Sequence, residues 1–362
     1  MQSHLRVLLA GGGSGGSAAP VVAVAEAIAR RWPDAECLYI GTTSGPERAL
    51  VKAAGLHYES VRTGRLRRYP TWRNLTDPGL VLVGMGQAGV IASRFRPDVA
   101  FGAGGFATVP PLLAARLLGV PVAIHQQDVL PSLANRMLAP FAAQLTVAVP
   151  DTRLRFRRRT AGVVGNPVRA SILQGDAARA REQFGLSPDL PVVLVTGGGT
   201  GALRLNQLAV EAAHDLVYEC QLVHLTGVGR SPVSWSHVNY RQFEFLAEPM
   251  ADALAVADVV VTRAGMSALS EVAALKKAAI VVPMANSHQE ANAAVFARHG
   301  AGIVRREEDL SGHGLAEEVR SLLADPSRRA ALGAAAALLL PPDAADAICS
   351  GIGALVSAAR NR

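Results

Sequence analysis

Short apolar runs rich in β-branched residues alternate along the chain with longer segments of helical composition. A run of about four to eight such residues is typical of a strand that is buried on both faces. Strands that alternate with helices predict parallel sheets covered by helices. The predicted strands are 6–10, 36–41, 98–101, 121–125, 145–149, 191–196, 259–262 and 279–283.

The alternation falls into two series, and each series opens with a strand and a glycine-rich turn, at 11–16 and 197–201. At 362 residues with 50% hydrophobic content, the chain is long enough for two domains with separate cores. We therefore expect an α/β fold with two Rossmann-like domains, parallel sheets and an inter-domain cleft. The expected domains are 1–165 and 166–340, followed by a C-terminal helix at 341–362 that packs back on the first domain.

The stretch 258–292 has the most informative pattern, which predicts strand, tight turn, helix, strand, loop and helix. A helix that begins at the carboxyl end of a buried parallel strand points its N–H groups and positive dipole end at an anion such as phosphate. Glu271 lies one turn into this helix, where a carboxylate can accept both hydroxyls of a ribose. The stretch predicts a nucleotide-sugar site. The competing interpretation is an ordinary βαβ unit with a capping serine and a solvated glutamate.

The glycine turns, including a third at 102–105, would let backbone N–H groups approach a phosphate closely. None of them is a P-loop, because no Lys-Ser/Thr pair follows the last glycine, and the first is not a clean dinucleotide fingerprint. Their occurrence at strand ends in both series, together with 258–292, favours a nucleotide-sugar protein over a nicotinamide enzyme.

The net charge of +7 is unevenly distributed: residues 1–170 carry 20 Lys+Arg against 9 Asp+Glu, and residues 171–362 carry 16 against 20. The basic first half predicts an anionic partner. Only 5% of residues are aromatic, which argues against base stacking on nucleic acid. An arginine cluster precedes the glycine-broken apolar segment 79–93 and favours an anionic membrane surface, with a solvated loop and a core helix as the alternative. The cluster comprises Arg62, Arg65, Arg67, Arg68 and Arg73.

The cysteines and the apolar segments indicate in which cellular compartment the protein is expected. Cys37, Cys220 and Cys349 lack metal-like spacing, which fits a reducing cytoplasm. The longest uncharged stretch, 99–115, is interrupted by glycine and proline, so we expect no transmembrane helix there. The apolar start of the chain is too short for a signal peptide. A soluble or peripheral protein is therefore expected.

Eight short motifs occur in the order seen in one known family. They are GGGSGG at 11–16, FGAGGFATVPP at 101–111, HQQD at 125–128, VGNPVR at 164–169, GGGTGALRLN at 197–206, EFLAEPM at 244–250, TRAGMSALSE at 262–271 and HQEANA at 288–293. With these motifs, which span nearly the whole chain, the sequence resembles the MurG-type glycosyltransferases of peptidoglycan synthesis. That family transfers N-acetylglucosamine (GlcNAc) from UDP-GlcNAc to lipid I (undecaprenyl-diphospho-N-acetylmuramoyl-pentapeptide), which gives lipid II. The resemblance implies a GT-B fold, inversion at the sugar carbon, no metal or other cofactor, and peripheral attachment to the cytoplasmic face of the cell membrane.

The resemblance also implies roles for individual residues. Arg169 is similar to the family's phosphate-binding arginine, and Leu246 stands where the family reads uracil through a backbone group. Glu271 is similar to the ribose-binding carboxylate, and His288 with Gln289 to the residues that contact the GlcNAc hydroxyls. The other substrate-binding residues implied are Ser14, Gly15, Gly16, Asp128, Gly199, Asn206, Met266, Ser267, Ala268, Leu269 and Ser270.

Four departures from the family's motifs bear on catalysis. Ser17 replaces the histidine of the first loop, Phe106 replaces the tyrosine of the second, and Gly199 replaces a serine. The family's HEQN segment is here His125-Gln126-Gln127-Asp128. Displacement at the anomeric carbon needs a base for the acceptor proton, which serine cannot supply unaided. We therefore expect His125 and Asp128 to be catalytic, with Asp128 either taking the proton itself or orienting His125 as the base.

Two other functions remain open at this point. The first is a UDP-GlcNAc 2-epimerase-like isomerase, which has a similar two-domain shape but needs acidic residues in the cleft and no membrane patch. The second is a non-catalytic UDP-sugar-binding relative.

Overall fold

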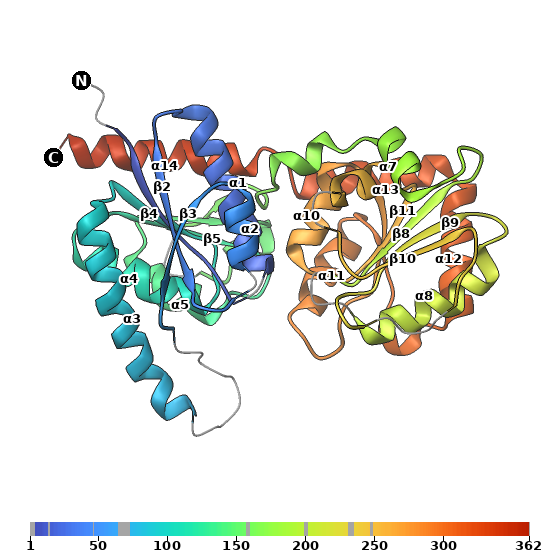
Figure 1. The fold of residues 1–362 in the computed structure, drawn as a ribbon, viewed down its shortest axis with the longest axis horizontal. Coiled ribbons are helices and arrows are strands. Elements are labelled where there is room, and N and C mark those ends of the chain that lie inside the picture. The colour runs from blue at the N-terminus through green and yellow to red at the C-terminus, as the bar shows by residue number, and fades with distance from the viewer. Residues whose placement is uncertain are drawn as a thin grey trace. The chain divides into compact units, whose positions relative to one another are not determined.

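The computed structural model describes residues 4–13, 15–45, 47–63, 73–156, 160–198, 202–230, 235–246 and 249–361. The chain divides into two compact units. Unit 1 comprises Met1–Arg169 and Asp343–Arg362, and unit 2 comprises Ala170–Pro342. Each unit is a parallel sheet covered by helices (Figure 1), so the predicted fold class of two Rossmann-like domains is confirmed.

Unit 1 contains a seven-stranded sheet in the order β3-β2-β1-β4-β5-β6-β7, and all of its pairs are parallel. Its central strands are buried on both faces because helices cover both. The strands are β1 (Arg6–Ala10), β2 (Glu36–Thr42), β3 (His57–Val61), β4 (Val99–Gly102), β5 (Val122–Gln126), β6 (Gln144–Val147) and β7 (Gly162–Val163).

The helices of unit 1 form two layers. On one face, Val7 and Leu9 share a core with α1 and with α14, the last helix of the chain. Arg30 of α1 also pairs with Asp346 of α14 at 2.9 Å. On the other face, Leu8 and its neighbours pack against α3, α4 and α5. The helices are α1 (Gly15–Arg31), α2 (Glu47–Ala53), α3 (Arg73–Phe95), η1 (Phe106–Thr108), α4 (Val109–Leu117), α5 (Leu133–Leu138), η2 (Ala139–Phe141), α6 (Pro150–Arg153) and α14 (Ala344–Arg360).

Unit 2 contains a six-stranded parallel sheet in the order β10-β9-β8-β11-β12-β13. Its strands are β8 (Val192–Thr196), β9 (Gln221–Leu225), β10 (Tyr240–Phe243), β11 (Val259–Thr262), β12 (Ala278–Val281) and β13 (Ile303–Val304). Its helices are η3 (Ala170–Gln174), α7 (Ala177–Phe184), α8 (Leu203–Leu216), α9 (Met250–Val256), α10 (Met266–Ala274), α11 (Gln289–Arg298), η4 (Glu307–Asp309), α12 (Gly312–Ala324) and α13 (Pro326–Leu339).

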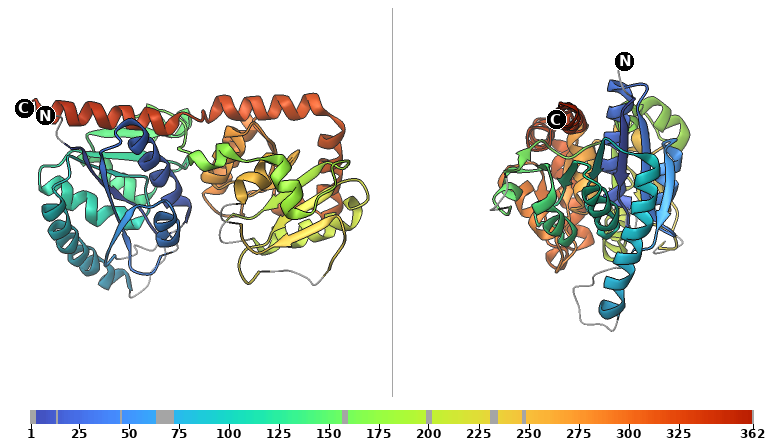
Figure 2. Two further views of the ribbon diagram at one scale, coloured as in Figure 1. Left: turned by 45° about the horizontal axis from the view of Figure 1, so that its top comes forward. Right: turned by 90° about the vertical axis from the view of Figure 1, so that its left-hand side faces the viewer.

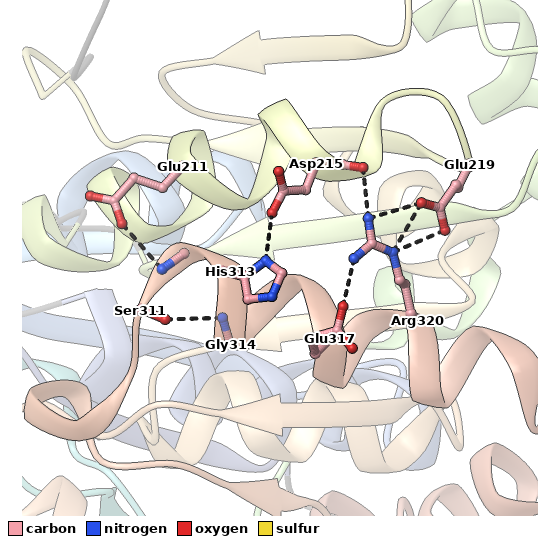
Figure 3. Close-up of polar contacts among 9 residues, drawn as sticks. Glu211, Asp215, Glu219, Ser311, His313, Gly314, Glu317 and Arg320 are labelled. Carbon is pink, nitrogen blue, oxygen red and sulfur yellow. Dashed lines mark hydrogen bonds and ion pairs between the residues drawn. The ribbon is translucent and has the colours of Figure 1, made fainter.

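Helices α8 and α12 cover one face of this sheet and are joined along their exposed edge by polar contacts (Figure 3). Acidic residues spaced four apart on α8 and in the turn after it contact α12. Glu211 accepts from the Gly312 amide at 3.1 Å, Asp215 pairs with His313 at 3.1 Å, and Glu219 pairs with Arg320 at 2.9 Å. Because these pairs are largely exposed, each contributes only about 0.2–1 kcal/mol.

The strand order of each sheet reverses at one place, and ligands of open α/β folds bind outside the carboxyl ends of the strands at such a switch point. In unit 1 the reversal lies between β1 and β4, and in unit 2 between β8 and β11. The glycine turns singled out in the sequence follow β1, β4 and β8, and the turn before α10 follows β11. The topology therefore brings these turns to the two places where a Rossmann-like unit binds ligands.

By length and composition, one segment of the described residues, Pro326–Arg360, is apolar enough to cross a membrane. In the structure this segment is two helices, α13 and α14, separated at Pro341-Pro342. Proline removes a backbone donor and clashes with the preceding turn, which ends the first helix. Figure 2 shows the interruption between the two helices. Leu339 is buried in α13 and Ile348 and Ile352 in α14, as expected of core helices.

Candidate active site

The glycine turns after β1 and β4 pack directly against each other in unit 1. Gly105 has φ of 86°, and a Cβ atom there would come within 2.5 Å of the Gly12 carbonyl oxygen and 3.3 Å of the Ser17 hydroxyl. Likewise, a Cβ atom on Gly13 would lie 2.2 Å from the ring of Phe106. Only glycine fits these contacts, so the two turns form one continuous surface at the switch point.

Ser17, which stands where the resembling family has histidine, lies in the first turns of α1 and is 8% exposed. Its hydroxyl donates to the Gly12 carbonyl at 3.3 Å. The hydroxyl thus faces its own loop.

The loop after β5 is tied to the same surface. The Gln127 amide donates to the Ala103 carbonyl in the turn after β4, at 3.0 Å. Gln126 donates to the Asp128 carbonyl at 2.9 Å and receives a bond from the Asn135 amide at 2.8 Å. These bonds fix the backbone around Asp128, whose side chain is half-buried at the carboxyl edge of the sheet. The sequence analysis did not single out Asn135.

His125 is fully buried on β5, and both of its ring nitrogens are engaged within unit 1. Nε2 lies 3.2 Å from Oδ1 of Asn166, and Nδ1 lies 3.0 Å from the Thr146 hydroxyl. An amide oxygen only accepts, so Nε2 carries the proton and Nδ1 accepts from the hydroxyl. Burial lowers the pKa of His125 to about 4, although the Asn166 bond opposes the shift. The expected arrangement in which Asp128 orients the His125 ring is therefore not formed, because Thr146 and Asn166 occupy both nitrogens.

Asn166 connects His125 to the segment that carries Arg169. Gly165, with φ of 83°, turns the chain after β7, and Asn166-Pro167 follow as buried residues. Arg169 is half-buried and is the last residue of the first segment of unit 1. The buried histidine thus holds the turn from which Arg169 emerges.

In unit 2, α10 begins at the carboxyl end of β11 as the sequence predicts. Gly265 precedes the helix and has no side chain to cap it, so the first N–H groups point to the carboxyl edge of the sheet. The predicted ligand residues of α10 divide by burial. Ser267, Ala268 and Glu271 are half-buried, whereas Met266, Leu269 and Ser270 are buried, with the Ser270 hydroxyl donating to the Met266 carbonyl at 2.7 Å.

Two buried side chains that the sequence analysis missed hold the turn before α10. Asn292 of α11 donates to the Ala264 carbonyl at 2.9 Å. Arg263 donates to the carbonyls of Val282 at 3.1 Å and Pro283 at 3.3 Å, and it pairs with Glu307 at 2.5 Å. The loops after β11 and β12 are therefore fixed to each other.

The other predicted donor residues of unit 2 lie at the same edge of its sheet. His288 is exposed and directly precedes α11, and the first residue of that helix, Gln289, accepts from the Met284 amide at 3.0 Å. Leu246 is half-buried in the segment after β10.

Asn206 is buried on α8, and its amide bonds within unit 2. Its Oδ1 lies 3.2 Å from Nε2 of His224, and its Nδ2 donates to the carbonyls of Thr226 at 2.8 Å and Arg230 at 3.1 Å. Asn206 therefore supports the loop after β9. Among the other predicted site residues, Gly15 and Gly16 begin α1, while Ser14 and Gly199 lie outside the described residues.

Two helix N-termini at sheet switch points, a half-buried carboxylate beside one glycine surface and another on α10, suit an enzyme that binds a phosphorylated sugar donor and deprotonates an acceptor. The comparisons with known proteins agree. Residues 7–147 match the glycosyltransferase family 28 N-terminal domain, and residues 192–348 match the C-terminal domain of the same family. The chain belongs to glycosyltransferase family 28.

Curated family 28 relatives cover most of the chain. One from Nocardioides sp. is 39% identical over 352 residues, which is 94% of this chain and 95% of the relative. One from Lachnospira eligens is 35% identical over 325 residues, which is 88% of this chain and 91% of the relative. Both are named UDP-N-acetylglucosamine–N-acetylmuramyl-(pentapeptide) pyrophosphoryl-undecaprenol N-acetylglucosamine transferase.

Solved structures support the GT-B fold of this family 28 chain. Acinetobacter baumannii MurG aligns with a TM-score of 0.72 at 24% identity, covering 97% of this chain and 99% of that one. A putative UDP-N-acetylglucosamine 2-epimerase from Listeria monocytogenes aligns with a TM-score of 0.74 at 12% identity, covering 97% and 96%. At these identities the likeness concerns the fold alone, and it does not distinguish transferase from epimerase.

Proposed function

We propose that this family 28 protein is an inverting glycosyltransferase that moves N-acetylglucosamine from UDP-GlcNAc to lipid I and forms lipid II. The observation that carries the proposal is the activity named for relatives at 32–39% identity, which align over 87–94% of this chain. The arrangement of α10 in unit 2 supports the same reading, because it offers an uncapped helix start for a diphosphate and a carboxylate one turn further on.

The donor is proposed to bind unit 2. The diphosphate lies at the start of α10, and Glu271 accepts the ribose hydroxyls. Leu246 contacts uracil through its backbone, and His288 with Gln289 contacts the sugar hydroxyls. Arg263 and Asn292 do not touch the donor in this proposal, since their side chains are committed to the loops that shape its site.

The acceptor is proposed to bind unit 1 at the glycine surface after β1 and β4. The acceptor hydroxyl oxygen forms the new bond to the anomeric carbon, the bond from that carbon to the UDP oxygen breaks, and UDP leaves with the electron pair. Asp128 takes the acceptor proton, because its half-buried carboxylate lies at the carboxyl edge of the sheet, where the acceptor is proposed to bind. His125 is the positioning residue, since its buried neutral ring holds Asn166 rather than facing substrate.

The membrane-facing surface is proposed to be α3 with the arginine cluster before it. On α3 the side chains of Leu82, Val83 and Val90 are exposed, with Leu82 at 68%. Figures 1 and 2 show α3 running past the edge of the sheet of unit 1. Exposed apolar side chains on a helix that follows a basic segment in the sequence suit the cytoplasmic face of an anionic membrane, where a polyprenyl-linked acceptor is found. Arg65, Arg67 and Arg68 lie outside the described residues.

The activity is tested by incubating the protein with UDP-GlcNAc, with and without a lipid I analogue, and measuring UDP release and sugar products. Release of UDP only with the acceptor supports the proposal. An epimerised sugar nucleotide without the acceptor would support the isomerase instead. Binding of UDP-GlcNAc with no product under either condition would identify a non-catalytic relative.

The membrane proposal is tested by sedimentation with anionic vesicles. Replacing Arg65, Arg67 and Arg68 with Gln should release the protein, at about 1 kcal/mol per charge near the surface. The wild-type binding should weaken at high salt. The matched control replaces three exposed arginines of unit 2, Arg204, Arg298 and Arg328, and should bind as the wild type does. Binding that responds to neither salt nor the first triple variant would reduce the cluster to a solvated loop.

A further inference from the structure

Glu47, the first residue of α2, is a fully buried carboxylate beneath the glycine turn after β1. It accepts from the Thr42 amide at 3.0 Å, from the Thr42 hydroxyl at 2.5 Å and from the Gly13 amide at 3.3 Å. Thr42 ends β2 and Gly13 follows β1, so one side chain joins the ends of two neighbouring strands. No sequence motif singled this residue out.

The described residues contain no Lys or Arg that ion-pairs with Glu47, although buried charges are ordinarily paired. Its compensation comes instead from three hydrogen-bond donors and from the N-terminal end of α2, where a carboxylate is favoured. Such a group is costly to bury, so its retention at a ligand-binding edge suggests that the backbone groups it holds must keep one conformation.

The contact of Glu47 with the turn at Gly12-Gly13, called the Glu47 clamp below, is completed by a second side chain that covers the same turn. A Cβ atom on Gly12, where φ is 144°, would lie 2.6 Å from the Glu47 carboxylate. On the following residue, Gly13, with φ of 92°, the added atom would meet Phe106 instead. The turn is thus held between a carboxylate on one side and an aromatic ring on the other. Because α1 begins two residues later at Gly15, fixing Gly13 also fixes the start of that helix.

We propose that Glu47 is a positioning residue for the acceptor: it fixes the turn at Gly12-Gly13 and thereby the N-terminus of α1 against which the acceptor binds. This inference rests on the proposed function, which assigns the acceptor to unit 1. Because the proposed donor ligands are the residues of unit 2 around α10, a change at Glu47 should affect acceptor binding and not donor binding. Glu47 makes no contact with substrate and acts through the backbone amide of Gly13.

The test is Glu47→Gln, which keeps the side chain's shape but loses the charge and half of its accepting capacity. Acceptor KM, kcat and the UDP-GlcNAc dissociation constant are measured separately, with thermal unfolding as a check on folding. We expect kcat/KM for the lipid I analogue to fall about tenfold or more, mainly through KM, while donor affinity stays within about twofold. Glu47→Asp, which retains the charge, should recover part of the loss. The control Glu59→Gln, an exposed carboxylate on the neighbouring strand β3, should behave as the wild type does.

An unchanged acceptor KM in folded Glu47→Gln overturns the proposal, and so does a parallel loss of donor affinity, which would indicate general damage. If Glu47→Gln does not fold, Thr42→Val decides, because it removes only the hydroxyl bond and should shift acceptor KM in the same direction by less. A wild-type protein that releases no UDP with acceptor refutes the proposed function instead. The clamp is then judged by hydrogen exchange at the Gly13 amide, which should quicken in Glu47→Gln if the carboxylate holds the turn and stay unchanged if it does not.

Discussion

His125 in unit 1 and His224 in unit 2 have similar surroundings, although their strands, β5 and β9, hold different positions in the two sheets. Each is the fourth residue of a five-residue strand, and each is fully buried. In both, Nε2 lies 3.2 Å from an asparagine Oδ1 and Nδ1 faces a hydroxyl, that of Thr146 at 3.0 Å or Tyr240 at 2.7 Å. Burial lowers the pKa of both to about 4.

What differs is the segment that each asparagine supports. Asn166 lies in the turn that leads to Arg169, whereas Asn206 lies on α8 and supports the loop after β9. The residues beyond the histidines differ as well, because His125 is followed within three residues by Asp128 and His224 by Gly227. A histidine at a strand end is therefore a poor sign of a base by itself. We therefore place the proposed chemistry in the loop after β5 and not on the histidine itself.

The largest effect is expected from Asp128→Asn, which removes the proposed base. Turnover should fall ~10²-fold or more while UDP-GlcNAc affinity is nearly kept, since the donor is proposed to bind the other unit. The comparison variant His125→Gln keeps a donor near Asn166 and should lose much less. The measurement is the kcat of both variants with a lipid I analogue, with Asp34→Asn, an exposed carboxylate, as control.

A fully active Asp128→Asn enzyme would place the base elsewhere. If kcat fell as much in His125→Gln as in Asp128→Asn, His125 would take part in catalysis directly. It would then differ in role from His224.

The next effect concerns pH and should appear in both units alike. The pKa of each histidine is about 4 when folded and near 6.5 when unfolded, so the unfolded chain binds the proton first as the pH falls. The stability that each neutral ring contributes is present above about pH 6.5 and is lost between about pH 6.5 and 4. From pH 7 to 5 the loss should be on the order of 2 kcal/mol per histidine.

Variants that keep only Trp32 or only Trp235, with the other tryptophans including Trp72 replaced by Phe, allow the two units to be followed separately in urea unfolding at these two pH values. Trp235 packs on the core of unit 2, and Trp32 on that of unit 1. His125→Gln should flatten the pH dependence seen in unit 1 only, and His224→Gln that of unit 2 only. If the unfolding free energy changed equally with pH in the wild type and the variants, burial would not lower the pKa of either histidine.

The fold was accessible from the sequence because its central strands are short apolar runs. β1 and β11 have the predicted bounds, since both faces of these strands are covered. The prediction missed the edge strands β3, β7, β10 and β13, of which β3 is mostly exposed and β10 only partly buried. It also missed β9, which is fully buried but carries the polar residues Gln221 and His224. Edge strands lack the continuous apolar run on which the prediction relied.

The candidate site was accessible only where its residues stand next to a strand end. The start of α10 was found because a glycine break follows a buried strand. Glu47, Asn292 and Arg263 were missed because each acts on backbone that is distant in sequence, 34 residues away for Glu47 and Gly13 and 28 for Asn292 and Ala264. Such pairings depend on the strand order, which local patterns do not contain.

A smaller effect is expected at the donor site of unit 2. Glu271→Ala should raise the UDP-GlcNAc dissociation constant about tenfold or more, because a charge-assisted bond to a diol contributes ~1.5–3 kcal/mol. Acceptor KM at saturating donor should change little. Equilibrium binding of UDP-GlcNAc checks the first expectation, and steady-state kinetics the second. Unchanged donor affinity would show that Glu271 does not bind the donor. It would also contradict the assignment of the donor to unit 2.

The smallest effect comes from two buried tyrosines, one in each unit. The Tyr240 hydroxyl donates to Nδ1 of His224 at 2.7 Å, whereas that of Tyr39 has no hydrogen-bond partner among the described residues. Burial raises the pKa of both, and at Tyr39 the nearby Glu47 adds to the shift. Tyr240→Phe leaves a buried nitrogen without its donor and should cost about 1 kcal/mol of unfolding free energy.

Tyr39→Phe removes no hydrogen bond seen in the structure, so the stability of unit 1 should change by less than about 0.5 kcal/mol or rise slightly. Urea unfolding followed by Trp32 for Tyr39→Phe and by Trp235 for Tyr240→Phe measures each cost in its own unit. Equal costs would mean that the Tyr39 hydroxyl has a hydrogen-bond partner in solution, such as a bound water. A larger cost for Tyr240→Phe than for Tyr39→Phe would show that the hydrogen bond from Tyr240 to His224 stabilises unit 2. Burial of the tyrosine alone would then not account for the effect.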